Sequence, residues 1–538
     1  MKTPLTILRS IHPAILGSLG LAWTLSSPAL ADAAPDQEEA ANAAVDKDAD
    51  KAKSKKNSEA AKDEAAAAAA ETSAGAKPTR IAQEEEPAPA MEEPPAPVEE
   101  PPAAESGEHR SHLPEEGVRK MIQEEMGKAY KPFEYHGYMR SGFGINGKGG
   151  DQDAFQAPGT PVKYRLGNET ETYGEMIFVN NWLKPENSSD KLFFKTEILL
   201  TFVTANNSNF DASDIFTIRE AFAQAGGVVE AAPDLKFWAG QRYYHRHDTH
   251  IDDFFYLSMS GYGGGIEDLK LGSDAAGKLA FGYFGASTND IVTDNGRPVK
   301  HVLDLRLEDV ALAGQATFWV AGSRFQGGET DTGELPSTNG VAVGALHTIP
   351  DFMGGFNKFV LQFGTGTLTD YDIFFRTPGD APNDNPTSVN DEDAWRFRAI
   401  EALVVQQTPM VSLMGTALVQ ITDYGSDENS KESWYSAGVR PVLHFTDYLT
   451  TAFEVGFDYV DSEFALNADG EVGSAGYLTK LTVAPQVQAG RSFWGRPAIR
   501  AYFTYALWSD DFEGRVGGPT YAGDKAGIGA GLQAEAWW

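Results

Sequence analysis

The sequence predicts an all-β fold, a transmembrane antiparallel β-barrel over residues 133–538 that follows a long N-terminal extension. Apolar and polar residues alternate with period 2 throughout this region, as they do in strands with one apolar and one polar face. Loops rich in Asp, Asn, Gly and Ser separate the alternating segments, and the chain ends on an aromatic residue, Trp538. Apolar side chains facing lipid explain the alternation, and closure is required because lipid cannot satisfy an open sheet edge.

The first 31 residues have the organisation of a cleaved signal peptide. Lys2 and Arg9 precede an apolar stretch over 14–25, and Ala29-Leu30-Ala31 forms an A-x-A cleavage pattern. The alternative is an ordinary buried N-terminal helix. No later stretch has the ~20 apolar residues that a membrane helix needs, so the sequence predicts an exported protein whose membrane segments are strands.

Residues 32–108 are rich in Ala, Glu, Pro and Lys and contain no Phe, Tyr or Trp. Such a segment cannot form a core, so we expect a disordered N-terminal extension located in the periplasm. It is either a plain tail or a tether to the cell wall or to a periplasmic protein. Residues 109–132 predict a short helix, a possible coiled coil, because apolar residues from Val118 to Ala129 share one face.

The alternation is clearest in the C-terminal third of the chain, at 452–460, 481–488, 499–508 and 528–538. In the last of these segments, Ile528, Leu532 and Trp538 share one face, and Gln533 and Glu535 share the other. A soluble β-sandwich gives the same alternation with its apolar faces turned inward. Long loops at one end and short turns at the other favour the barrel.

Composition excludes several classes of function. The formal net charge is −33, which opposes binding to nucleic acid. The absence of cysteine excludes disulfide scaffolds and zinc sites built from cysteine.

Polar residues crowd into GQRYYHRHDTHIDDFFYLS at 240–258. His245, His247, Asp248 and His250 have the chemistry of metal ligands, but the neighbouring arginines oppose cation binding. The other interpretations are a solvated loop and the lining of a narrow, wet channel. We expect the lining and no metal site.

Several motifs resemble the maltoporin family of trimeric, eighteen-stranded, sugar-specific porins. They are HGYMRSG (136–142), KYRLGNE (163–169), RYYHRHDTHIDDFFY (242–256) and SFWGRPAIRAYFTYALW (492–508), in the order that the family has them. The extension is similar in kind to that of the related sucrose porins. The resemblance implies eighteen strands, an inward-folded constriction loop at 242–256, a homotrimer in the outer membrane, no cofactor and no enzymatic activity.

In that family a series of aromatic side chains, the greasy slide, stacks against the apolar faces of sugar rings. Matching by motif assigns slide positions to Tyr138, Tyr173 and Trp494, and a loop aromatic that reaches a neighbouring subunit to Phe210. Two further slide positions match non-aromatic residues, Val343 and Met410. The slide is therefore expected to be thinned in its middle.

An ionic track opposite the slide exchanges hydrogen bonds with sugar hydroxyls, and charged partners strengthen such bonds. The residues that match this track or the constriction are Arg140, Arg165, Glu175, Arg219, Arg246, His250, Asp253 and Phe255. Phe255 stands where the family has a tyrosine, so one hydroxyl is missing there.

These features favour a channel for facilitated diffusion of maltose, maltodextrins or related oligosaccharides. A general diffusion porin with weak sugar selectivity is the alternative, and a secreted glycan-binding β-sandwich is the alternative of another class. Expected partners are an oligosaccharide solute, two further copies of the chain, outer-membrane lipid and lipopolysaccharide.

Overall fold

The computed structural model describes residues 130–183, 191–204, 215–287, 291–331, 333–373, 392–426, 429–468 and 470–538. The predicted signal peptide, the extension over 32–108 and nearly all of the predicted helix over 109–132 lie outside these residues, and so does Phe210. Among the residues described, no helix has the length and apolar character needed to cross a membrane.

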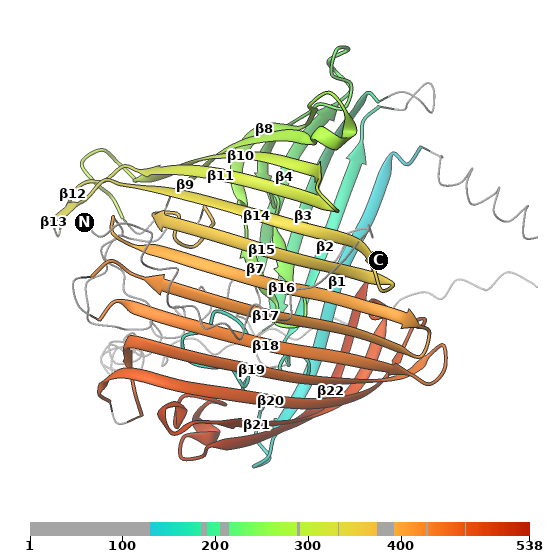
Figure 1. The fold of residues 1–538 in the computed structure, drawn as a ribbon, viewed down its shortest axis with the longest axis vertical. Helices are drawn as coiled ribbons and strands as arrows, with labels where there is room; N and C mark the ends of the chain where they lie inside the picture. The colour runs from blue at the N-terminus through green and yellow to red at the C-terminus, as the bar shows by residue number, and fades with distance from the viewer. Residues whose placement is uncertain are drawn as a thin grey trace, which may run out of the picture. The chain divides into compact units, whose positions relative to one another are not determined.

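Eighteen strands form a single closed antiparallel sheet (Figure 1). Each strand pairs with the next long strand along the chain, and β1 pairs with β22 to close the barrel. The first nine barrel strands are β1 (Phe133–Asn146), β2 (Thr172–Asn181), β3 (Phe193–Thr204), β4 (Ile215–Gly226), β5 (Lys236–Arg242), β8 (Gly261–Lys270), β9 (Lys278–Ser287), β10 (Val299–Ala311) and β11 (Gln315–Phe325). The other nine are β14 (Thr338–Phe352), β15 (Gly355–Gly366), β16 (Trp395–Thr408), β17 (Val411–Asp423), β18 (Lys431–His444), β19 (Leu449–Leu466), β20 (Val472–Gln488), β21 (Ala498–Trp508) and β22 (Ala526–Trp537).

The connecting segments contain short elements of their own. Two hairpins lie outside the barrel sheet, one formed by β6 (His247–Thr249) and β7 (Phe254–Leu257), the other by β12 (Gly328–Thr330) and β13 (Gly333–Leu335). Within the described residues, the 3₁₀ helices are η3 (Asp274–Ala276), η5 (Asp510–Phe512) and η6 (Pro519–Tyr521).

The predicted alternation is present in the strands. In β19, Phe453 and Val455 are exposed on the outer face, whereas Glu454 and Asp458 are buried on the inner face. The outer face is apolar and the inner face polar, which is the pattern of a barrel in lipid. The predicted eighteen-stranded barrel is confirmed. Because the strands form one closed sheet, the alternative of a two-sheet sandwich is wrong.

Two connections fold against the inner wall, and we call them inner loop A (147–171) and inner loop B (243–260). In loop A, the Leu166 carbonyl accepts hydrogen bonds from Lys480 Nζ at 2.6 Å and Thr482 Oγ1 at 3.1 Å. In loop B, the Tyr256 carbonyl accepts hydrogen bonds from Gln362 and Arg398, at 2.9 Å and 2.8 Å. The expected inward-folded loop is therefore present, and a second loop accompanies it.

Candidate channel lining

Four aromatic side chains form a continuous run inside the barrel. The ring centroids of Tyr173 and Tyr138 are 6.0 Å apart, and the ring of Tyr138 stacks on that of Trp537 at 6.5 Å. Trp537 in turn lies 6.5 Å from Trp494, which projects from the turn between β20 and β21. The barrel thus brings together three predicted slide residues, and Trp537 connects them. We call these four side chains the aromatic run.

The expectation of a thinned slide is wrong for the two positions on which it rested. Val343 lies on the outer face of β14 and is 43% exposed, and Met410 lies in the turn after β16 and is 62% exposed. Neither residue lines the interior, so the lack of an aromatic ring at either one does not interrupt the aromatic run. Sequence reasoning missed Trp537, although alternation places it on the same face of β22 as Glu535.

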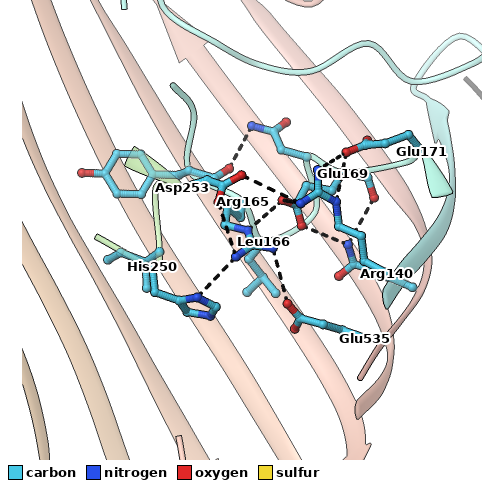
Figure 2. A network of polar contacts seen from close by, with 12 residues as sticks. Arg140, Arg165, Leu166, Glu169, Glu171, His250, Asp253 and Glu535 are labelled. Carbon is cyan, nitrogen blue, oxygen red and sulfur yellow. Dashed lines mark hydrogen bonds and ion pairs between the residues drawn. The ribbon is translucent and has the colours of Figure 1, made fainter. Parts of the chain in front are cut away.

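A network of ion pairs joins the two inner loops and the barrel wall (Figure 2). Arg165 in loop A is bonded to Glu169 at 2.7 Å, and Arg140 on β1 is 3.2 Å from the same carboxylate. Asp253 in loop B lies 3.7 Å from Arg165 and 3.8 Å from Arg140. Glu171 also pairs with Arg140. The network therefore joins both inner loops to the barrel wall.

Glu535 on β22 is a second centre of this network, and the sequence did not point to it as a site residue. Its carboxylate lies 3.4 Å from Arg165, 2.7 Å from Arg496 and 2.8 Å from Arg500. The hydroxyl of Tyr138 donates a further hydrogen bond to it, at 3.2 Å. One buried carboxylate therefore pairs with three guanidinium groups and accepts a hydrogen bond from one tyrosine of the aromatic run.

The aromatic run and this part of the ionic network are adjacent, which corrects the expectation that they face each other across the channel. The guanidinium of Arg140 lies 5.1 Å from the Tyr173 ring centroid. Arg165 donates a hydrogen bond to the Tyr138 hydroxyl at 2.7 Å. The charged groups therefore restrain the rings of Tyr173 and Tyr138, because one has a guanidinium over its face and the other a hydrogen bond to its hydroxyl.

Loop B presents alternate side chains to opposite sides. Asp253 and Phe255 are half-buried, whereas Phe254 is fully buried. The Arg246 guanidinium packs between two rings, 3.5 Å from the centroid of Phe255 and 4.4 Å from that of Tyr243. Phe255 therefore restrains the Arg246 guanidinium. The sequence indicated only that Phe255 lacks the hydroxyl of the family's tyrosine, and it did not predict this contact.

The remaining predicted charges, Glu175 and Arg219, gather around Tyr243. The Tyr173 hydroxyl donates to Glu175 at 2.6 Å. Burial raises the pKa of Tyr243 to about 12, while Arg246 and Arg219 oppose that rise and Glu175 adds to it. The hydrogen bond to Tyr173 therefore joins Glu175 to the aromatic run.

The three histidines of loop B point toward different partners. His245 Nδ1 is 3.0 Å from Glu308, whereas the ring of His247 stacks 6.1 Å from that of Tyr256. His250 packs 5.0 Å from Trp494, and burial together with nearby Arg165 holds its pKa well below the usual range. Across the ranges that the structure describes, no group of three His, Cys, Asp or Glu side chains is arranged to hold a metal ion.

The arrangement suits a solute that has both apolar faces and hydroxyl groups. Rings of the aromatic run offer stacking surfaces, and carboxylate and guanidinium groups beside them accept and donate hydrogen bonds. The charges of the network are paired with each other, so a neutral polar solute can exchange hydrogen bonds without being held by a net charge.

Comparison with known proteins relates this chain to one family. The sequence model of a family described as LamB porin matches residues 133–538. Among solved structures, the fold is similar to Pseudomonas aeruginosa OccD3 (OpdP), with 13% identity over 76% of this chain and 91% of that chain and a TM-score of 0.40. Acinetobacter baumannii OccAB4 is similar at 13% identity over 76% of this chain and 99% of that chain, with a TM-score of 0.39. These structural similarities are too distant to bear on function.

Proposed function

Because this chain belongs to the LamB porin family, we propose that it is an outer-membrane channel that guides maltose, maltodextrins or related oligosaccharides by facilitated diffusion. Family and barrel together make it an outer-membrane porin, a transport channel rather than an enzyme. The observation that carries the sugar proposal is the aromatic run lying directly beside the ionic network.

Sugar passage through such a lining needs contacts that are weak and repeated. A pyranose ring has an apolar face that stacks on an aromatic ring, and its hydroxyls exchange hydrogen bonds with charged side chains. Conduction requires binding that is favourable enough for entry and weak enough for exit. Tyr138, Tyr173 and Trp494, with Trp537 added, provide successive stacking surfaces, and Arg140, Arg165 and Asp253 provide the hydrogen bonds.

The partners follow from this role. Members of porin families generally form oligomers, and we propose a homotrimer for this chain. Its exposed outer face would contact outer-membrane lipid, and its loops lipopolysaccharide. We further propose that residues 1–31 are removed on export and that the extension lies in the periplasm, where it meets the cell wall or a periplasmic protein. No cofactor is needed.

A general diffusion porin with weak sugar selectivity is the second candidate, and one observation favours it. Tyr138 and Tyr173 are buried, and the Tyr138 hydroxyl is already bonded to Arg165 and Glu535. Only Trp494 and Trp537 are half-buried, so fewer rings are open to a passing solute. With fewer available stacking surfaces, sugar binding is weaker and ion flow is less affected by sugar.

Conductance in planar bilayers separates the two candidates. Detergent-purified, refolded protein is inserted, and maltose, maltotriose, maltohexaose and sucrose are titrated in turn. Block of the ion current that increases with maltodextrin length supports the sugar-guiding channel. Ion flow that no sugar blocks supports the general porin, and well-folded protein that forms no channels contradicts both.

A further inference from the structure

Glu454, a buried carboxylate on the inner wall, connects both inner loops to the barrel. It lies on β19 and is 1% exposed. Its Oε2 accepts a hydrogen bond from Arg440 Nε at 2.7 Å, and its Oε1 accepts one from Lys480 Nζ, also at 2.7 Å. Arg440 and Lys480 come from the strands on either side, β18 and β20. One carboxylate therefore pairs with two buried cations from neighbouring strands.

This group of three charges holds the backbone of inner loop A. The Leu166 N–H donates to Glu454 Oε1 at 3.1 Å, and the Leu166 carbonyl accepts from Lys480 Nζ at 2.6 Å. Both backbone groups of one loop residue are thus satisfied by opposite charges of the same ion pair. Because hydrogen bonds to charged groups are stronger than neutral ones, Leu166 is fixed in position and in rotation.

The same group also reaches inner loop B. Arg440 Nη2 donates to the Ile251 carbonyl at 3.3 Å, and the Arg165 N–H donates to the same oxygen at 2.9 Å. The two loops therefore meet each other and the wall at one point. Leu166 and Ile251 belong to one buried apolar cluster, against which Trp494 packs.

The wall beside this point is shaped to receive loop A. The Tyr164 ring lies over Gly438 and Gly456, and a Cβ added at these glycines would fall 2.0 Å and 2.1 Å from ring atoms. The Tyr164 hydroxyl also bonds to Ser436 at 2.9 Å. Loop A is therefore anchored on both sides of Arg165, by Tyr164 and by Leu166.

We propose that Glu454 is a positioning residue for solute passage, because it sets the backbone of both inner loops next to the side chains that face the solute. Arg165 adjoins Leu166 in loop A, and Asp253 lies two residues beyond Ile251 in loop B. Their contact with each other, at 3.7 Å, depends on both anchored backbones. This inference rests on the proposed sugar channel and assigns a wall residue that sets its specificity.

Two variants and a matched control test the proposal. E454Q keeps the size of the side chain but leaves two buried cations without a counter-charge. R440K keeps the charge on residue 440, but one ammonium group cannot reproduce the forked contact with both Glu454 and Ile251. D458N is the control, because Asp458 is a buried inward carboxylate on the same strand, and asparagine keeps the Oδ1 that accepts a hydrogen bond from the Trp434 indole at 3.0 Å, so this wall contact is retained. Heat-modifiable electrophoretic mobility selects folded protein, and single-channel recording gives the open-channel current noise and the on and off rates of maltohexaose block.

The expected result separates positioning from folding. Folded E454Q and R440K show greater open-channel noise than wild type, and their off rate for maltohexaose rises by about tenfold while the on rate stays within roughly threefold, because mutations at a binding site act mostly on dissociation. D458N behaves like wild type in both respects. If E454Q does not fold, R440K alone decides. Noise and off rates for R440K that equal those of D458N would overturn the proposal.

Failure of the proposed function gives a different result. If no sugar blocks the wild-type current, the sugar channel is excluded. The open-channel noise of R440K, compared with that of D458N, still decides whether Glu454 and Arg440 position the inner loops.

Discussion

Each face of inner loop B carries one aspartate and one phenylalanine, but the contacts of these residues differ between the two faces. The sequence DDFF at 252–255 contains two aspartates and two phenylalanines in succession. Asp252 is 1% exposed and Phe254 is 4% exposed, both packed toward the wall. By contrast, the side chain of Asp253 is 18% exposed and pairs with arginines of the network, and Phe255 stacks on Arg246.

This difference shows that the face of the loop, not the residue type, decides the role. Phe254 packs edge-to-face on Trp434 with ring centroids 5.2 Å apart, and it lies under Arg398 at 4.6 Å. Asp252 accepts a hydrogen bond from Thr249 within the loop. The wall face therefore holds the loop in place, and we propose that the opposite face meets the solute. Substitutions at the four positions test this division.

The largest difference is expected between the two phenylalanines. Replacing Phe254 with Ala leaves a cavity against Trp434 and lowers the free energy of unfolding by about 3–5 kcal/mol. Replacing Phe255 with Ala removes a half-buried cation–π contact and costs about 1 kcal/mol. Urea unfolding of protein refolded into vesicles, followed by tryptophan fluorescence, measures both changes. Equal losses for the two variants would show that the loop has no dedicated wall face.

The next largest difference is expected in the pH dependence of the two aspartates. Burial raises the pKa of Asp252 to about 8, against the lowering effect of the Thr249 hydrogen bond. Between pH 4 and pH 8 the folded protein then holds a proton that the unfolded chain releases. The free energy of unfolding therefore falls as pH rises through this window, by at most about 1.4 kcal/mol per pH unit from this group.

Asp252→Asn removes that pH dependence, because asparagine does not titrate. Unfolding in urea at pH 6 and pH 8, compared between wild type and the variant, measures the change, and Asp253→Asn serves as control. If the free energy of unfolding of Asp252→Asn changed between pH 6 and pH 8 as much as that of wild type, the titrating group would be a residue other than Asp252.

A smaller difference is expected in ion selectivity. Asp253→Asn removes a negative charge that faces the interior and leaves Arg140 and Arg165 with less compensation, so the channel becomes less permeable to cations relative to anions. Asp252→Asn is expected to have little effect at neutral pH, because that carboxyl is buried and its raised pKa favours the neutral form. Reversal potentials in a potassium chloride gradient measure the ratio of cation to anion permeability. A shift in Asp252→Asn as large as that in Asp253→Asn would argue against the division of the two faces.

The smallest effect is expected from Phe255→Tyr. The added hydroxyl offers one neutral hydrogen bond to a solute, and such a bond contributes about 0.5–1.5 kcal/mol. The dissociation constant for maltohexaose block should therefore fall by no more than roughly tenfold. Loss of block in this variant would mean that the ring cannot keep its stack on Arg246 when it carries a hydroxyl.

The barrel could be predicted because each strand carries its own evidence. In β21, for example, Ile499, Phe503 and Tyr505 are exposed and Arg500 and Thr504 are buried, as the alternation indicates. An apolar face toward lipid and a polar face toward the interior leave a period-2 pattern that needs no knowledge of neighbouring strands. The match to maltoporin motifs, and not the alternation, pointed to Arg140, Arg165 and Asp253, which lie close together in the structure.

The rest of the site depends on contacts that the sequence does not record. Glu535 meets Arg165 across 370 positions of the chain, because closure of the barrel brings β22 beside loop A. Glu454 is visible in the sequence only as one of many inward residues of a strand. The misplacement of Val343 has a related cause, since a shift of one residue in a strand moves a side chain from the inner to the outer face. Met410 lies in the turn between β16 and β17, where no strand alternation applies.

Single-channel recording of wild type and Trp494→Ala, with maltose and maltohexaose on one side, tests the central claim most directly. Trp494 projects from a turn and is half-buried, so its removal shortens the aromatic run without removing a barrel strand. The account predicts stronger block of wild type by maltohexaose than by maltose, and a marked loss of that length dependence in Trp494→Ala. Equal block of both proteins by both sugars would contradict the claim that the aromatic run guides the solute.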